Sequence, residues 1–140
     1  MSDLQQKGYV AIVQCHIVME RCAGYFCEKA LSQRTGGFAA YPAGKPLRHI
    51  SLTCGGCCGR ALHRKLSNLV HKAARDEGIA KEQIVVHLAT CITKESYHGP
   101  ACPHLEYLKT LISRLGLDVV EDTHVVAIAE KRRQEGLYGR

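Results

Sequence analysis

The chain has 140 residues, 46% of them hydrophobic, which is enough for one domain around one core. Its polar start, Met1–Lys7, lacks the apolar stretch of a signal peptide, and no apolar run reaches the length of a membrane span. The chain has eight cysteines but only two phenylalanines and no tryptophan. We therefore expect a cytoplasmic protein with reduced thiols, which favours metal binding or redox chemistry over a disulfide framework.

The formal net charge of +6 comes from basic residues that are spread along the chain, apart from the run Lys131–Arg133. The sequence has no recognised nucleic-acid-binding motif and no basic stripe interleaved with aromatic residues. A scattered excess of this kind is typical of solvated helix faces. We expect neither a nucleic-acid nor a membrane partner, while small anions are compatible with the charge.

Short β-rich runs alternate with helical stretches, a pattern typical of βαβ units and a parallel sheet. The first strand is expected at Tyr9–Gln14 and the first helix from about Cys22 to Gln33. Apolar residues at helical spacing define the core face of this helix: Ala23, Phe26, Cys27, Ala30 and Leu31. An irregular connection then leads to a second strand at His49–Thr53.

The glycine-rich loop Cys54–Gly59 opens a helix from about Arg60 to Asp76. The buried stripe of this helix is expected to contain Leu62, Leu66, Leu69, Val70 and Ala73. A third strand, Ile84–Thr90, precedes the loop Cys91–Ala101 and a helix that starts at Pro103. Its core face is Leu105, Leu108, Leu111, Ile112 and Leu115. A short fourth strand is expected at about Asp118–Asp122, and the tail Val125–Arg140 is either a helix or an extension.

A cysteine or histidine stands where each expected strand stops: Cys15, Cys54, Cys91 and His124. If the strands are parallel, these ends share one edge of the sheet, where open α/β folds bind ligands. Residues far apart in sequence would then meet at one place. This is the main functional signal in the chain.

The pair Cys54 and Cys57, separated by two glycines between a strand and a helix, is the sharpest motif. Glycines allow a tight turn that brings two sulfur atoms together, and a helix N-terminus stabilises thiolates. This CxxC spacing fits a metal site or a redox dithiol equally well, and buried inert cysteines are the plain alternative.

Further candidates lie on either side of this motif. Cys102 is expected at the N-cap of its helix, where a thiolate feels the helix dipole, and His104 could add an imidazole. Cys22 and Cys27 would lie about 140° apart on one helix, so they could share a metal only if Cys22 precedes the helix. Core packing explains Cys27 about as well as ligation does.

Cys54 and Arg60 also satisfy the spacing C-x5-R, which resembles the phosphate loop of protein tyrosine phosphatases and some arsenate reductases. In such a loop the backbone and the arginine hold an oxyanion that the cysteine attacks. However, Ala61 follows the arginine where those phosphatases usually have Ser or Thr, and no Asp-Pro pair supplies a general acid.

Together these motifs resemble the CGGC-domain family over about Tyr9 to His124. The motifs are Cys15, Cys22-Ala-Gly-Tyr-Phe-Cys27, Cys54-Gly-Gly-Cys57, Thr90-Cys91-Ile92, Gly99-Pro-Ala-Cys102-Pro-His104 and Thr123-His124. The resemblance implies a small prokaryotic protein that binds zinc through cysteines and histidines. The family motif commonly continues with proline, whereas this chain has Cys58, which is either an extra ligand or a spare thiol.

We therefore predict a single three-layer α/β domain of flavodoxin-like or Rossmann-like type, with a mainly parallel sheet of at least four strands flanked by helices. Residues 1–124 would form the CGGC domain and residues 125–140 its C-terminal extension. The expected metal ligands are Cys15, Cys54, Cys57, Cys91 and Cys102, followed by Cys22, His104 and His124. Zinc is the first choice because it suits mixed thiolate and imidazole ligands, and an iron–sulfur cluster is the second.

The alternative from another class is an enzyme, either a thiol-based oxidoreductase or an oxyanion reductase or phosphatase. In that case Cys54 would attack, Cys57 or Cys58 would resolve the intermediate, and Arg60 would hold the anion. The sequence leaves this choice open, together with the substrate, any protein partner and the oligomeric state.

Overall fold

The computed structural model describes residues 7–56, 59–94 and 102–123. Within them, four strands form one sheet in the order β2-β1-β3-β4, and every neighbouring pair is parallel. The strands are β1 (Tyr9–Gln14), β2 (Arg48–Thr53), β3 (Ile84–Leu88) and β4 (Asp118–Glu121). The prediction of a mainly parallel sheet of at least four strands is confirmed.

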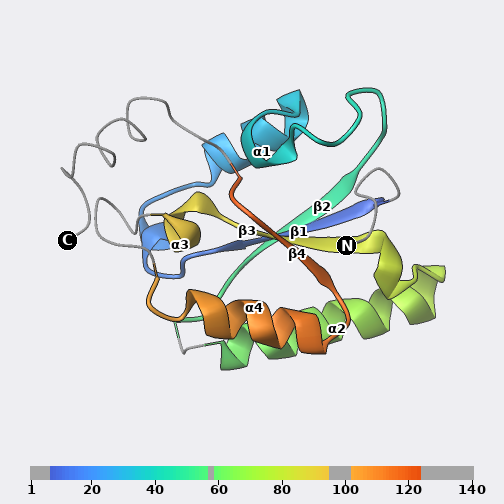
Figure 1. Cartoon of the computed structure of the whole chain (residues 1–140). Helices are drawn as coiled ribbons and strands as arrows, with labels where there is room; N and C mark the ends of the chain where they lie inside the picture. The colour runs from blue at the N-terminus through green and yellow to red at the C-terminus, as the bar shows by residue number, and fades with distance from the viewer. Residues whose placement is uncertain (1–6, 57–58, 95–101, 124–140) are drawn as a thin grey trace.

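Helices cover both faces of this sheet (Figure 1). The described helices are α1 (Tyr25–Gln33), α2 (Arg60–Glu77), the short α3 (Thr90–Thr93) and α4 (Leu105–Arg114). Figure 1 shows α1 on one face, with α2 and α4 together on the other. Right-handed crossovers produce this arrangement, because the chain moves in opposite directions from β1 to β2 and from β2 to β3. The result is the expected three-layer α/β domain.

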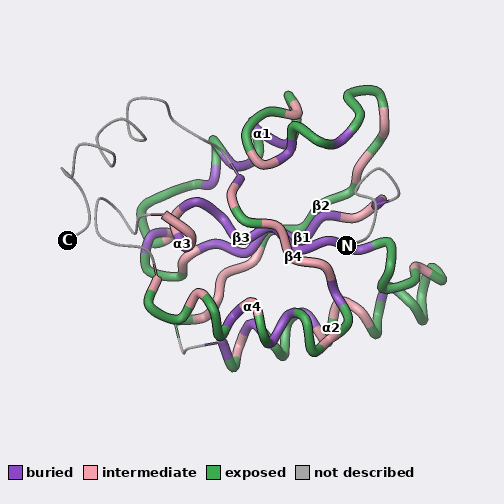
Figure 2. Tube along the Cα trace, in the orientation of Figure 1, coloured by how far each residue is buried: buried purple, intermediate pink, exposed green. Residues whose placement is uncertain are grey.

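Each face of the sheet has its own apolar core. The core on the α2 and α4 side includes Ala11, Val13, Leu62, Leu66 and Ile112. The core on the α1 side includes Val10, Ile12, Leu31, Phe38 and Val85. The central strands β1 and β3 are buried almost throughout, whereas the outer strand β2 is mostly exposed (Figure 2). A central parallel strand needs apolar side chains in both directions, which explains the continuous apolar runs of β1 and β3.

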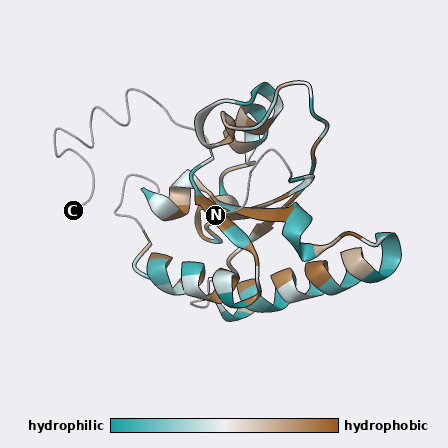
Figure 3. Ribbon diagram, turned by 45° about the vertical axis from the view of Figure 1, so that its right-hand side comes forward, coloured by the Kyte–Doolittle hydropathy of each residue, from teal (hydrophilic) through white to brown (hydrophobic). Residues whose placement is uncertain are grey.

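The helices turn their apolar sides to the sheet and their polar sides to solvent (Figure 3). In α2 the expected stripe is buried at Leu62, Leu66 and Ala73 and half-buried at Leu69 and Val70. In α4 the buried residues are Leu108, Leu111 and Ile112. Helical periodicity therefore predicted these two faces correctly.

The first helix differs from its prediction. It begins at Tyr25 rather than near Cys22, because Gly24 adopts a φ of +84° and interrupts the helical path. A separate 3-10 turn, Val18–Glu20, precedes it. Ala23 and Phe26, which were expected on the core face, are exposed.

Two boundaries near the later cysteines were also wrong. The third strand ends at Leu88 rather than Thr90, and Thr90–Thr93 forms helix α3 instead of a loop. The fourth helix begins at Leu105, with His104 rather than Cys102 at its N-cap. The other strand and helix boundaries agree with those expected to within one residue.

A buried polar cluster ties the end of β4 to the rest of the domain. His87, fully buried, accepts a hydrogen bond at Nε2 from the Tyr41 hydroxyl (2.6 Å) and donates from Nδ1 to the Asp122 carbonyl (3.1 Å). Its ring packs on Phe38 with centroids 4.3 Å apart. Burial lowers the pKa of His87 to about 4, so the imidazole is neutral at pH 7.

Gly37 adds a second tie to the end of β4. Its N–H donates to the Thr123 carbonyl at 2.8 Å, and a Cβ at this position would lie 2.2 Å from the Asp122 carbonyl oxygen. Only glycine allows this close approach. Asp122 and Thr123 are therefore fixed at the same edge of the sheet as the ends of β1 and β3.

Candidate metal centre

The strand order places a topological switch point between β1 and β3. The chain passes from β1 to β2 on one side, whereas β3 and β4 lie on the other. Ligands of open α/β sheets bind in the crevice beyond the carboxyl ends of the strands at such a point. Cys15 follows β1 directly, and Cys91 lies in α3 just beyond β3. Two of the four strand-end candidates thus flank the switch point.

A direct contact joins these two cysteines. The backbone N–H of Cys15 donates to Sγ of Cys91 at 3.2 Å. Burial raises the pKa of the Cys91 thiol to about 12, and the N–H of Cys15 acts in the opposite direction. The thiols of Cys15, Cys27 and Cys22 raise this pKa further by charge repulsion. The hydrogen bond therefore places the end of β1 beside the Cys91 thiol.

Cys22 and Cys27 lie in different local structures. Cys22 is exposed and precedes α1, and its Sγ accepts the N–H of Gly24 at 3.4 Å. Cys27 is buried in α1, with Sγ 3.2 Å from the Thr123 hydroxyl. Cys22 thus precedes the helix, which was the condition for Cys22 and Cys27 to share a metal.

The remaining described candidates lie at the same edge, on the side of the sheet covered by α2 and α4. Cys54 follows β2, and its N–H donates to the Gln14 carbonyl at 3.0 Å. Cys102 is bound to the end of α3 through its N–H and the Ile92 carbonyl (2.8 Å), and its Sγ accepts the N–H of His104 at 3.4 Å. Both cysteines are half-buried against the core, and His104 is exposed.

Three of the predicted site residues, Cys57, Cys58 and His124, lie outside the described residues. Among the residues that are described, no three Cys, His, Asp or Glu side chains form a group that could hold a metal ion. The fold therefore places the described strand-end cysteines at one edge of the sheet, and the described part of the chain does not by itself form a complete ligand shell.

The CGGC loop uses its glycines for shape. Gly55 and Gly56 have φ values of +83° and +72°, and Gly59 has a φ of +108°. A Cβ on Gly59 would lie 2.6 Å from a methyl group of Leu111, so this residue also lets α2 start close to α4. These constraints place Arg60 at the first position of α2.

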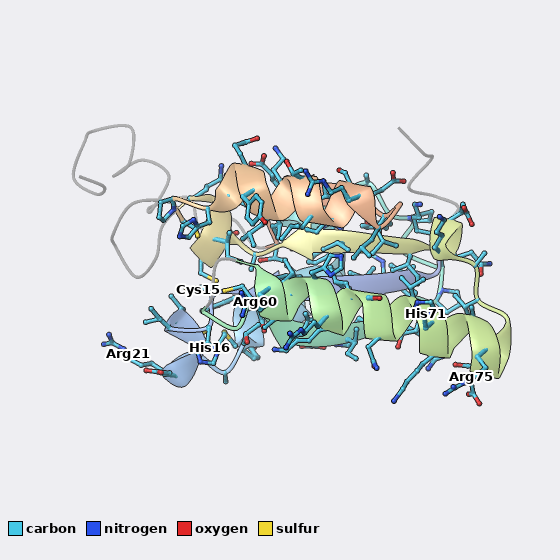
Figure 4. All side chains as sticks on the ribbon, turned by 90° about the horizontal axis from the view of Figure 1, so that it is seen from below. Cys15, His16, Arg21, Arg60, His71 and Arg75 are labelled. Atoms are coloured by element: carbon cyan, nitrogen blue, oxygen red, sulfur yellow. The ribbon has the colours of Figure 1, made fainter. Side chains whose placement is uncertain are left out.

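His16 was absent from the predicted set, although it directly follows Cys15. Its Nδ1 lies 3.2 Å from the Thr53 hydroxyl, and its ring faces Gly56. Figure 4 shows Cys15, His16 and Arg60 at the same end of the molecule, whereas His71 and Arg75 lie farther along α2. The position of His16 directly after a strand-end cysteine could have identified it as a candidate from the sequence. Its imidazole lies beside the CGGC loop.

A parallel α/β domain with cysteines gathered at its switch point defines the class to which this protein belongs. The model of the CGGC domain matches residues 9–124, and the chain therefore belongs to the CGGC domain family. An uncharacterized protein of Methanocaldococcus jannaschii is 34% identical over 73 residues, which cover 52% of this chain and 94% of that protein. No solved structure matches the chain. None of the helices in the described ranges is long and apolar enough to span a membrane.

Proposed function

We propose that this protein binds a metal ion through cysteines at the carboxyl edge of its sheet. The observation that carries the proposal is the contact at the switch point between the ends of β1 and β3, where the N–H of Cys15 donates to Sγ of Cys91 at 3.2 Å. Cys54 and Cys102 lie at the same edge. Membership of the CGGC family supports the same conclusion, because that family is described as metal-binding.

The chemistry of the donors decides which metal fits. Thiolates are soft ligands, and together with imidazole they suit zinc or an iron–sulfur cluster better than magnesium or calcium. The ligands we propose are Cys15, Cys54, Cys57, Cys91 and Cys102, supported by Cys22, His104 and His124. A structural zinc ion would stabilise the loops of this edge, and an open zinc site would supply a Lewis acid.

Metal binding at Cys91 would be coupled to loss of the thiol proton. A buried thiol with a pKa of about 12 stays neutral at pH 7, and a bound metal ion removes its proton. The N–H of Cys15 already points at this sulfur and stabilises its anionic form. Metal binding should therefore release protons, and acid should weaken it.

Metal content of protein purified without oxygen tests the proposal. Elemental mass spectrometry should find about one zinc ion per chain with a colourless spectrum, or iron with broad visible absorption. The variant Cys91→Ser should lose most of the metal, whereas Cys27→Ser should keep it because Cys27 belongs to the core under α1. Metal-free protein with all thiols titratable would contradict the proposal.

A second candidate is thiol chemistry at the CGGC loop. The observation that favours it is the glycine-rich turn that leads from Cys54 to Arg60 at the start of α2, beside His16. In this mechanism Arg60 would hold a substrate oxyanion and the Cys54 thiolate would attack its central atom. Cys57 would then attack Cys54 and release the reduced product, and the two thiols would supply the two electrons as they form a disulfide. A Cys54–Cys57 disulfide that forms on oxidation of metal-free protein, with reductase activity lost in Arg60→Ala, would favour this candidate.

A further inference from the structure

The outer edge of β2 lies outside the cysteine site. Within the described ranges β2 pairs only with β1, and it stands at the end of the sheet. The N–H groups of Arg48 and Cys54 both donate toward β1, to Gly8 and Gln14. Because these groups alternate in direction along a strand, the N–H and C=O groups of His49 and Ser51 point away from the sheet. Such an edge can accept a further strand.

A groove of about 600 Å³ runs between this edge and α2. Its floor is apolar and consists of Ile50, Leu52 and Leu69, with Ile50 40% exposed. Parallel sheets normally cover such side chains on both faces. An extended segment beside β2 could place its own apolar side chains on this floor.

The rim of the groove is cationic and comprises Arg64, Lys65 and Lys72. From Arg60 to Arg75 helix α2 contains no acidic residue, and its first turn lacks the acidic side chain that a helix dipole favours. Three of the chain's basic residues therefore line one groove, although the sequence distributes its basic residues along the whole chain. Lys65 already binds a strand-edge oxygen, the carbonyl of Thr53, at 3.2 Å.

We propose that this β2–α2 groove binds an extended acidic polypeptide segment of a partner protein, which adds to the sheet as a strand beside β2. Backbone bonds to His49 and Ser51 would supply part of the affinity, and the apolar floor and the cationic rim would select alternating apolar and acidic side chains. A second copy of this chain fits less well, because pairing two β2 edges would bring two basic α2 helices together. Nucleic acid would use the cations but neither the apolar floor nor the strand edge.

Fluorescence anisotropy with a labelled nonapeptide of alternating Glu and Val tests this. Comparison probes are an alternating Lys and Val peptide, an all-Glu peptide and a single-stranded DNA oligonucleotide. The Glu and Val peptide should bind at least tenfold more tightly than each comparison probe, and the variant Lys72→Glu should weaken it about tenfold. Ile50→Asp should abolish binding, whereas Ile17→Asp, a change at an isoleucine that is 63% exposed outside the groove, should leave binding unchanged.

Methylation of alternate peptide amides tests the strand geometry with the wild-type protein, so the test does not depend on a folded variant. Of the two methylated versions, one should lose binding and the other should keep it, because only alternate amides face β2. Equal loss in both versions would overturn the proposal. So would equal or tighter binding of the DNA or the all-Glu peptide, or a dimer of this chain that Ile50→Asp dissociates.

Discussion

Acidification should destabilise this domain through His87. The imidazole is fully buried, with both nitrogens in hydrogen bonds to Tyr41 and Asp122, and burial lowers its pKa to about 4 from 6.5. In the unfolded chain His87 is protonated below about pH 6.5, whereas in the folded chain it is protonated only below about pH 4. Stability that is fully present above pH 6.5 is therefore lost progressively as the pH falls toward 4.

The size of this loss follows from the two pKa values. Each unit of pKa difference corresponds to about 1.4 kcal/mol. The linkage relation then gives a decrease in the free energy of unfolding of about 2 kcal/mol between pH 7 and pH 5, and about 3 kcal/mol when the transition is complete. Since His87 is shielded from solvent, little of this difference is screened.

Urea denaturation of the wild type and of His87→Gln at pH 7 and pH 5 checks the prediction. The amide does not titrate, so the variant should show about 2 kcal/mol less pH dependence than the wild type over this interval. His63→Gln, a change at an exposed histidine of α2, is the matched control and should keep the wild-type dependence. Equal pH dependence in His87→Gln and in the wild type would refute the reasoning.

Three further predictions test other parts of the fold. Gly37→Ala should destabilise by at least about 2 kcal/mol in thermal unfolding, because its Cβ would lie 2.2 Å from a carbonyl oxygen, while Gly44→Ala, with no atom within 4 Å, should be neutral. Lys7→Ala should cost about 3 kcal/mol in urea denaturation, because it removes the buried ammonium together with its ion pair to Asp118 at 2.9 Å and its hydrogen bond to the Glu82 carbonyl at 2.6 Å. In metal-free protein at pH 7, Cys91 should react with a thiol reagent at least tenfold more slowly than the exposed Cys22, since burial raises the pKa of Cys91 to about 12; comparable rates in mass-spectrometric mapping would contradict this.

The positions of the strands and helices could be predicted from the sequence because local patterns determine them. The apolar runs of β1 and β3 and the helical stripes of α2 and α4 depend on neighbouring residues, and these elements agree with expectation to within two residues. The prediction for the start of α1 was wrong because apolar spacing continues back to Cys22, whereas Gly24 adopts a left-handed conformation that interrupts the helix. Helix α3 was not predicted because a helix of four residues is too short to show a periodic pattern.

The candidate site was predictable only as a location. Strand ends indicated which cysteines would share an edge, but the contact between Cys15 and Cys91 joins residues 76 positions apart. The partners of His87 lie 46 and 35 positions away, so the spacing of residues in the sequence could not predict its hydrogen bonds. In the same way, the basic rim of the β2–α2 groove exists only once α2 lies beside β2.

X-ray absorption at the metal edge, on protein purified without oxygen, tests the central claim most directly. Sulfur ligation at this edge of the sheet predicts at least two sulfur neighbours at about 2.3 Å from a bound zinc ion. The sulfur shell should be reduced in Cys91→Ser and retained in Cys27→Ser. A shell of oxygen and nitrogen only, or a sulfur shell that persists in Cys91→Ser, would contradict the account.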